Sequence, residues 1–398
     1  METNPSRDRE GAVSRELTRN SIPIDLIREG ERVFRLCNAC RYCEGYCAVF
    51  PAMERRLTFT EKDLNYLANL CHNCGECYYA CPYAPPHEFA LNLPRTLAEI
   101  RVATYRKYAW PGFLRDLFRR NGLAATAAMV AGPFLFLVAM LVFGAPGTLF
   151  SAHGDREGAF YAVLSHSAMT LTFGAASVAV LAALAIGMAR FWLEIDEGTC
   201  ASPNGAALGV AALGQAVWDT LRLRYLEGGG EGCASSDERA SHARRWFHHL
   251  TFYGFLLCFA STTVAAIYHY VFAWEAPYPF LSAPVLLGTA GGAGLLAGPV
   301  GLLWLKRNRN TELTDPKQAG MDFAFLALLF LTSVTGLFLL VLRETRAMGI
   351  LLGVHLGIVM GLFVAMPYGK FVHATYRFAA LLRNAMEKRR SSSEAGKG

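Results

Sequence analysis

Eight of the 11 cysteines in this 398-residue chain lie close together, in two runs that share one spacing. The first run is Cys37-x2-Cys40-x2-Cys43-x3-Cys47, and the second is Cys71-x2-Cys74-x2-Cys77-x3-Cys81, followed by Pro82. Runs as short and regular as these are poorly suited to a disulfide framework, but thiolates bind iron and zinc. The chemistry that these residues could do is therefore the binding of metal centres in a reducing compartment.

The order of the cysteines within each run favours iron–sulfur clusters, in the pattern of bacterial two-cluster ferredoxins. Three cysteines at short intervals let one loop hold three corners of a cubane, and the fourth cysteine serves the other cluster. We therefore expect two [4Fe–4S] clusters, with cluster 1 held by Cys37, Cys40, Cys43 and Cys81, and cluster 2 held by Cys71, Cys74, Cys77 and Cys47. The alternative is a pair of zinc sites, although zinc usually takes two separated C-x2-C pairs. One departure from the pattern is that Ala48, rather than a proline, follows Cys47.

The rest of the chain is apolar enough to cross a membrane. Hydrophobic residues make up 53% and charged residues only 18%, with a mean hydropathy of +0.25, whereas a soluble protein carries about a quarter charged residues. Six apolar runs can each supply the ~20 residues that a bilayer requires; they are 123–143, 161–189, 249–273, 284–305, 321–342 and 350–372. The net charge of +6 comes from short basic clusters beside these runs, and we expect no nucleic-acid partner.

The distribution of basic residues predicts the orientation in the membrane. Loops on one side hold most of the arginines and lysines, whereas the opposite loops hold only Arg156, Arg343 and Arg346. Six spans with both termini in the cytoplasm satisfy this asymmetry. The same orientation places the cysteine-rich head in the cytoplasm, where thiolates stay reduced. We expect a multi-pass protein of the bacterial cytoplasmic membrane.

Histidines at the ends of two predicted spans are candidate haem ligands. The third span runs from His248 and His249 to His269, and the sixth from His355 to His373. The 18 residues from His355 to His373 make five whole helical turns and cover about 27 Å, so both rings leave one face of the helix. Two antiparallel spans then pair His269 with His355, and His248 or His249 with His373, with helical phase favouring His248. Two such pairs would hold two b-type haems, one haem for each pair. The alternative is that these histidines only bridge membrane helices.

These features predict an α-helical integral membrane protein, in which a two-cluster ferredoxin-like head is fused to a six-helix, cytochrome b-like bundle. The expected segments are a disordered N-terminus (1–21), the head (22–100), an interfacial connector (101–122), the membrane domain (123–376) with a cytoplasmic loop (190–247), and a basic, disordered tail (377–398).

Several stretches resemble one family. They are CNACRYCEGYCAVFPAMERR, LANLCHNCGECYYACPYAPPHEFALNLPRTLAE, SHARRWFHHLTFYGFLLCFAS and MPYGKFVHATYR. They are similar to tricarballylate/citrate utilisation protein B, and the membrane half distantly resembles nitrate-reductase gamma-type cytochrome b subunits. The resemblance implies that a soluble flavoprotein partner dehydrogenates a tricarboxylate such as tricarballylate. This chain would then reoxidise the reduced flavin and deliver electrons to the membrane.

The function that we expect is electron transfer from a partner's flavin through two [4Fe–4S] clusters and haem to quinone. The chain lacks a GxGxxG fingerprint for a dinucleotide, so the flavin should belong to the partner. Tyr368 and Lys370 are candidate quinone contacts. An alternative is a heterodisulfide-reductase-like or sulfur-metabolism conduit with the same cofactors. A tricarboxylate transporter would need cationic side chains near mid-membrane, which the spans lack, and a redox sensor would need an output domain.

Overall fold

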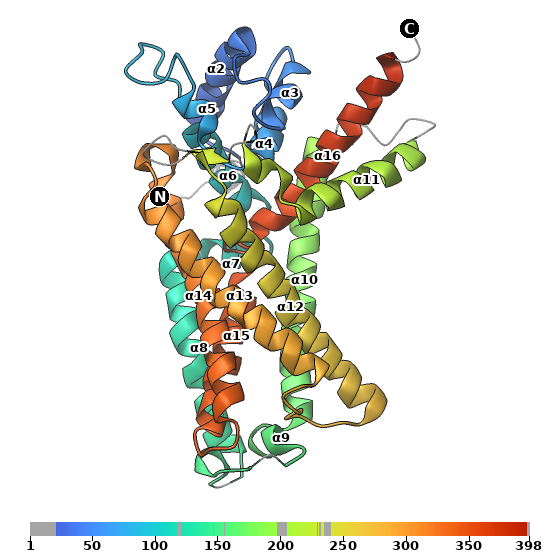
Figure 1. The fold of residues 1–398 in the computed structure, drawn as a ribbon. Helices are drawn as coiled ribbons and strands as arrows, with labels where there is room; N and C mark the ends of the chain where they lie inside the picture. Colours follow the sequence, from blue (N-terminus) through green and yellow to red (C-terminus); the bar gives the residue numbers. More distant parts are fainter. Residues whose placement is uncertain are drawn as a thin grey trace, which may run out of the picture.

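The structure is a computed structural model that describes residues 21–117, 121–145, 147–154, 156–196, 205–228, 230, 232–234 and 240–395. A small helical head sits on one end of a bundle of long helices (Figure 1). The predicted disordered N-terminus lies outside the described residues except for Ser21.

Among the described residues, six helices are long and apolar enough to cross a membrane. They are α8 (Asn121–Phe143), α10 (His166–Ile195), α12 (Ala243–Phe272), α13 (Ala283–Arg307), α14 (Pro316–Leu342) and α15 (Met348–Ala365). Helices α10 and α14 begin at residues that satisfy free backbone amides, because Ser165 accepts from the amide of Ala168 and Asp315 from that of Lys317. The six predicted spans are thus confirmed.

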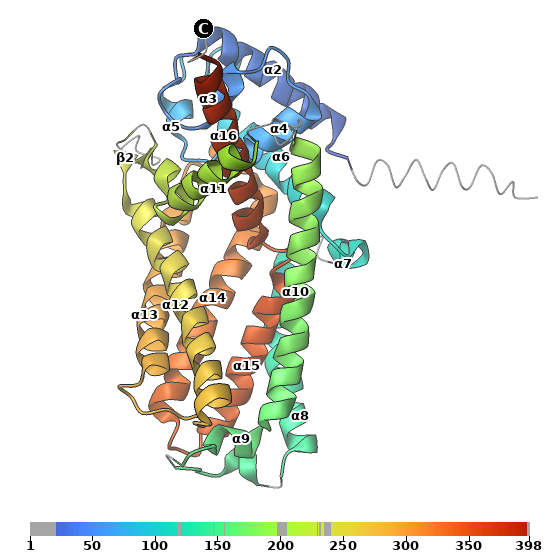
Figure 2. The same ribbon diagram turned by 90° about the vertical axis from the view of Figure 1, so that its right-hand side faces the viewer.

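Helices α12 and α13 pack along one another, and α15 packs against both α8 and α14 (Figure 2). Small residues allow these close approaches, as is common in membrane bundles. A side chain added at Gly254 of α12 would lie 2.9 Å from the carbonyl oxygen of Gly291 on α13. Where α8 crosses α15, a Cβ at Gly357 would overlap the backbone of Gly132 and Pro133.

The crossing of α8 and α15 gives a stability prediction. The variant Gly357→Val should destabilise the bundle by about 1–3 kcal/mol, the usual cost of overpacking, because backbone atoms cannot move aside as a side chain can. The matched control is Gly174→Val on α10, where nothing lies within 4 Å of the added Cβ. Thermal unfolding of both variants in detergent would check this, and equal midpoints would contradict the close approach.

The sixth span is shorter than the sequence predicts. Helix α15 ends at Ala365, residues 366–371 form turns, and a new helix, α16 (Val372–Ala395), begins beyond them. The expectation that one helix carries both His355 and His373 is therefore wrong. The sequence does carry a signal for this break, because Pro367 and Gly369 are the two poorest helix-forming residues.

The head consists of α2 (Ile24–Cys40), α3 (Val49–Glu54), α4 (Glu61–Leu70), α5 (Glu76–Tyr79) and α6 (Leu93–Tyr108), followed by α7 (Gly112–Leu117). Helix α6 corrects the predicted connector at 101–122. Its residues Arg101, Thr104, Tyr105 and Tyr108 are buried in the head. Lys107, one of the basic residues that suggested a membrane surface, pairs instead with Glu61 and Glu194 of the protein.

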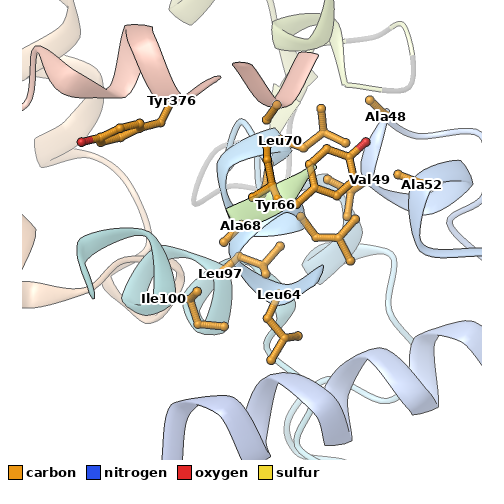
Figure 3. Packing of buried hydrophobic residues seen from close by; sticks show 14 of the residues in the cluster. Ala48, Val49, Ala52, Leu64, Tyr66, Ala68, Leu70, Leu97, Ile100 and Tyr376 are labelled. Carbon is orange, nitrogen blue, oxygen red and sulfur yellow. The ribbon is translucent and has the colours of Figure 1, made fainter. Parts of the chain in front are cut away.

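The predicted disordered tail is likewise wrong as far as residue 395. Helix α16 packs against α4 and against α11 (Gly205–Leu221). Figure 3 shows Tyr376 of α16 at the edge of the buried cluster formed by the head. Glu387 of α16 also pairs with the buried Arg56 at 2.6 Å. The polar composition of this segment reflects buried ion pairs rather than disorder.

Short elements complete the described chain. They are η2 (Thr148–Phe150), α9 (Ala159–Val163), η4 (Arg224–Glu227), η5 (Thr311–Leu313), and the two strands β1 (Cys233–Ala234) and β2 (Ala240–Ser241). The strands pair antiparallel in the segment between α11 and α12. Helix α10 extends to Ile195 and α12 starts at Ala243, so the predicted loop at 190–247 is helical at both ends and in its middle.

Candidate metal centres

The eight cysteines of the two runs surround two cavities in the head. The first cavity is lined by Cys37, Cys40, Cys43, Cys77 and Cys81. The second cavity is lined by Cys47, Cys71, Cys74 and Cys77. Three cysteines of one run and the last cysteine of the other run therefore line each cavity, in the sets that the spacing predicts, and Cys77 lines both. Aromatic and aliphatic side chains form most of the remaining walls.

Local backbone geometry folds each run around its cavity. Helix α2 ends at Cys40, and Arg41 takes a left-handed conformation (φ 56°) that turns the chain back toward Cys43. In the second run, Asn73 (φ 52°) and Gly75 (φ 91°) make the corresponding turns. A residue with a Cβ at position 75 would be strained, since few L-residues adopt this φ. The backbone amide of Asn73 also donates to the sulfur of Cys71 at 3.3 Å.

The electrostatics of the bare thiols fit the binding of a positively charged centre. Burial, followed by neighbouring thiolates, raises the pKa of Cys37 and of Cys43 to about 12. Burial raises the pKa of Cys74 to about 12 and holds those of Cys47 and Cys77 well above the usual range. Crowded, buried thiolates are unfavourable alone, and bound iron would offset their charge. The residues present therefore fit [4Fe–4S] clusters.

The order of the donors suits a cluster. Zinc takes four thiolates that converge on one centre, whereas a cubane takes its thiolates at separate corners. The sulfurs of the two runs line two cavities, in the sets that the spacing predicts for two clusters.

At the head end of the bundle, the structure brings together one of the two predicted histidine pairs. The rings of His248 on α12 and His373 on α16 have their centroids 6.2 Å apart, at an interplanar angle of 71°. Nδ1 of His373 donates to the carbonyl oxygen of Lys370 at 2.5 Å, which leaves Nε2 as its free nitrogen. His249 instead stacks on Tyr253. It is thus His248, and not His249, that faces His373.

At the far end of the bundle, the structure does not form the other predicted pair. No ring contact or hydrogen bond joins His269 to His355 in the described part of the chain. His269 stacks on His166, the first residue of α10, with centroids 3.7 Å apart. Nδ1 of His355 lies 3.0 Å from Oγ1 of Thr335 on α14. The pairing differs because α12 packs along α13 rather than along α15.

His166 is thus a partner of His269 that the sequence analysis did not predict. The signal that could have found it is topological. The second span starts, and the third span ends, on the same side of the membrane, so His166 and His269 have matching depth. Their face-to-face stacking differs from metal ligation, in which ring nitrogens point at a shared ion.

Two arginines connect the second cavity to the helices of the facing histidines. Arg244 lies four residues before His248 and donates to the carbonyl oxygens of His72 at 3.0 Å and Asn73 at 2.7 Å. Arg377 lies four residues after His373 and donates to the carbonyl oxygen of Cys71 at 2.7 Å. The second cysteine run is therefore held directly against both histidine helices.

The fold and the cysteine cavities define a multi-pass helical membrane protein with an iron–sulfur-type head. Comparison with known families agrees, since residues 30–107 match the citrate utilization protein B Fer4-like domain and residues 119–394 match citrate utilization protein B. The chain belongs to the citrate utilization protein B family. It is 52% identical to the citrate utilization protein B of Escherichia coli, over 91% of this chain and 93% of that protein. No solved structure matches it. The Fer4-like domain indicates an iron–sulfur electron-transfer role.

Proposed function

We propose that this chain reoxidises the flavin of a partner dehydrogenase and passes the electrons through two [4Fe–4S] clusters and b-type haem to the quinone pool. The observation that carries the proposal is the attachment of Cys71 and its neighbours to the helices of His248 and His373. When bound, clusters and haem accept and release single electrons without bond changes in the protein. The residues of the chain hold these groups in sequence from the head into the bundle.

The exposure of the two cavities supports a direction of transfer. At the first cavity, Cys40 is exposed, and the neighbouring Tyr42 is 64% exposed. At the second cavity, Cys71 is buried, and the wall includes Tyr225, from the segment that leads to α12. A protein partner can approach the first cavity closely, whereas the second faces the membrane domain. Electrons would therefore enter at the first cavity and leave from the second.

The facing histidines are the part of the bundle that fits a haem. His248 and His373 would hold the haem iron between them, since their rings face each other with centroids 6.2 Å apart. The hydrogen bond from His373 to the carbonyl oxygen of Lys370 fixes the ring as such bonds do for metal ligands. We place one b-type haem here and propose none at His269 or His355.

The other participants follow from the family. The partner would be a soluble flavoprotein acting on a tricarboxylate such as citrate or tricarballylate, and the head and both termini would face the cytoplasm. Each two-electron oxidation of reduced flavin releases two protons, and reduction of a quinone to quinol takes up two. Tyr368 donates to the carbonyl oxygen of Trp110, and Lys370 pairs with Asp322. Since both have partners within the protein, we propose neither as a quinone contact.

Cofactor analysis of the detergent-purified full chain tests the proposal. We expect about eight non-haem irons and about one b-type haem per chain. On reduction the broad iron–sulfur absorbance should bleach and the haem α and β bands should sharpen, and a quinone analogue should reverse both changes. Iron at this level without haem would mean that the histidines only pack helices. Zinc in place of iron would overturn the relay.

A further inference from the structure

Four arginines converge on the backbone beside the second cavity, and we call them the arginine collar. They are Arg101, Arg244, Arg309 and Arg377. Each donates to carbonyl oxygens within residues 68–73: Arg101 to Ala68 at 2.8 Å, Arg309 to Asn73 at 2.6 Å, and Arg244 and Arg377 as described above. They come from α6, α12, the segment after α13, and α16, so the collar joins the head to the membrane domain.

The positive charge of the collar is not compensated by acidic side chains. Among the residues that the structure describes, none of its four members pairs with a carboxylate. Arg101 is only 4% exposed, and its Nη2 has no hydrogen-bond partner in the described chain. Burial and the nearby Arg244 lower the pKa of Arg309 to about 10, and burial and Arg101 do the same for Arg377. Buried charges as crowded as these call for an anion.

The first cavity has no comparable set of cations. Among the described residues, no lysine, arginine, aspartate or glutamate lines either cavity directly, so the difference lies in the charges around them. Besides the other thiolates, the charged group that affects Cys43 is the acidic Glu76, and its negative charge disfavours the thiolate form. Arg41, in the turn between Cys40 and Cys43, is exposed, so solvent and salt screen its charge. By contrast, the positive charge of Arg244 favours the thiolate form of Cys74. The thiolates of Cys71 and Cys74 in turn favour the charged form of Arg309.

We propose that the arginine collar raises the reduction potential of the second iron–sulfur site above that of the first, so that electrons collect beside the His248–His373 pair. The inference rests on the proposed function, because it requires a cluster in each cavity. A [4Fe–4S] core with four thiolates is an anion that gains one further negative charge on reduction, and nearby cations stabilise the reduced form. In each transfer the first site loses one electron and the second gains it, with no proton moved and no bond broken.

One effect opposes this order. Burial favours the less charged, oxidised form, and the second site is more buried than the first, where Cys40 is exposed. Four positive charges in contact with the carbonyls of a single six-residue segment outweigh this effect, because in a buried site they are weakly screened. The order of the two potentials therefore depends on the collar, and removing one of its charges should lower only the second.

A redox titration of the full-length protein in detergent, followed by electron paramagnetic resonance, tests the proposal. In the unchanged protein, the centre that is lost in Cys74→Ala should be reduced at the more positive potential. The variants Arg309→Gln and Arg244→Gln should each shift this centre to a more negative potential and leave the other centre in place. Arg309→Lys, which keeps the charge, should retain most of the original value.

The control is Arg95→Gln, which removes the same charge from an exposed ion pair with Glu99 on α6 and should shift neither centre. Iron content and thermal stability of each variant separate a change in potential from misfolding. Two centres with the first more positive, or equal shifts of both centres in the collar variants, would overturn the inference and leave the relay standing. Absence of iron–sulfur centres would instead overturn the proposed function.

Discussion

Replacing Cys81 with alanine should remove the same iron–sulfur centre as replacing Cys37, and replacing Cys47 should remove the same centre as replacing Cys74. The reason is the exchange of fourth cysteines between the runs, which places Cys81 in the first cavity and Cys47 in the second. Each variant should fall from about eight to about four irons per chain. Because the two sites act in series, transfer of electrons to the membrane should fall by orders of magnitude.

The matched control for these variants is Cys258→Ala. Cys258 lies on α12 and lines neither cavity. Iron content and both resonance signals should therefore be unchanged. If Cys81→Ala removed the same centre as Cys74→Ala, each run would hold its own cluster, and the assignment of ligands would be wrong.

Replacing His373 with alanine should abolish the b-type haem absorbance of the purified protein. Loss of one axial imidazole from a bis-histidine site leaves the haem with a single protein ligand, and the Lys370 carbonyl that orients the ring loses its donor. We expect less than a tenth of the haem content of the unchanged protein. His248→Ala should have the same effect, because its ring faces that of His373.

Two neighbouring histidines serve as controls for the haem prediction. His249→Ala should keep the haem, because His249 stacks on Tyr253 and lies away from His373. His355→Ala should also keep it, since this ring binds Thr335 on α14. Haem that survives in His373→Ala but disappears in His355→Ala would place the group at the other end of the bundle.

The cysteine sites could be predicted from the sequence because their geometry is local. Intervals of two or three residues decide which thiols one loop can present, so Cys37, Cys40 and Cys43 reach the same cavity whatever surrounds them. The six spans were predictable for a similar reason, since a bilayer selects helices by length and hydropathy alone. Both depend on neighbours along the chain rather than in space.

The histidine pairs show where such reasoning stops. Helical phase favoured His248 over His249, in agreement with the ring that faces His373. The same reasoning assumed an unbroken sixth helix and therefore joined His355 and His373, although the chain turns between Ala365 and Val372. A pairing of residues on different helices depends on which helices pack together. The hydropathy of a span does not indicate which other span lies beside it.

Spacing and hydropathy were enough to predict the two sets of cysteines, the six spans and the family. Three features depend on packing instead: α16 is a helix that packs on the head, His166 meets His269, and the arginine collar converges on residues 68–73. The arginines come from segments as far apart as α6 and α16, and in the sequence they resemble ordinary topology signals. Their role arises from burial beside one cysteine run, which is a property of packing in three dimensions.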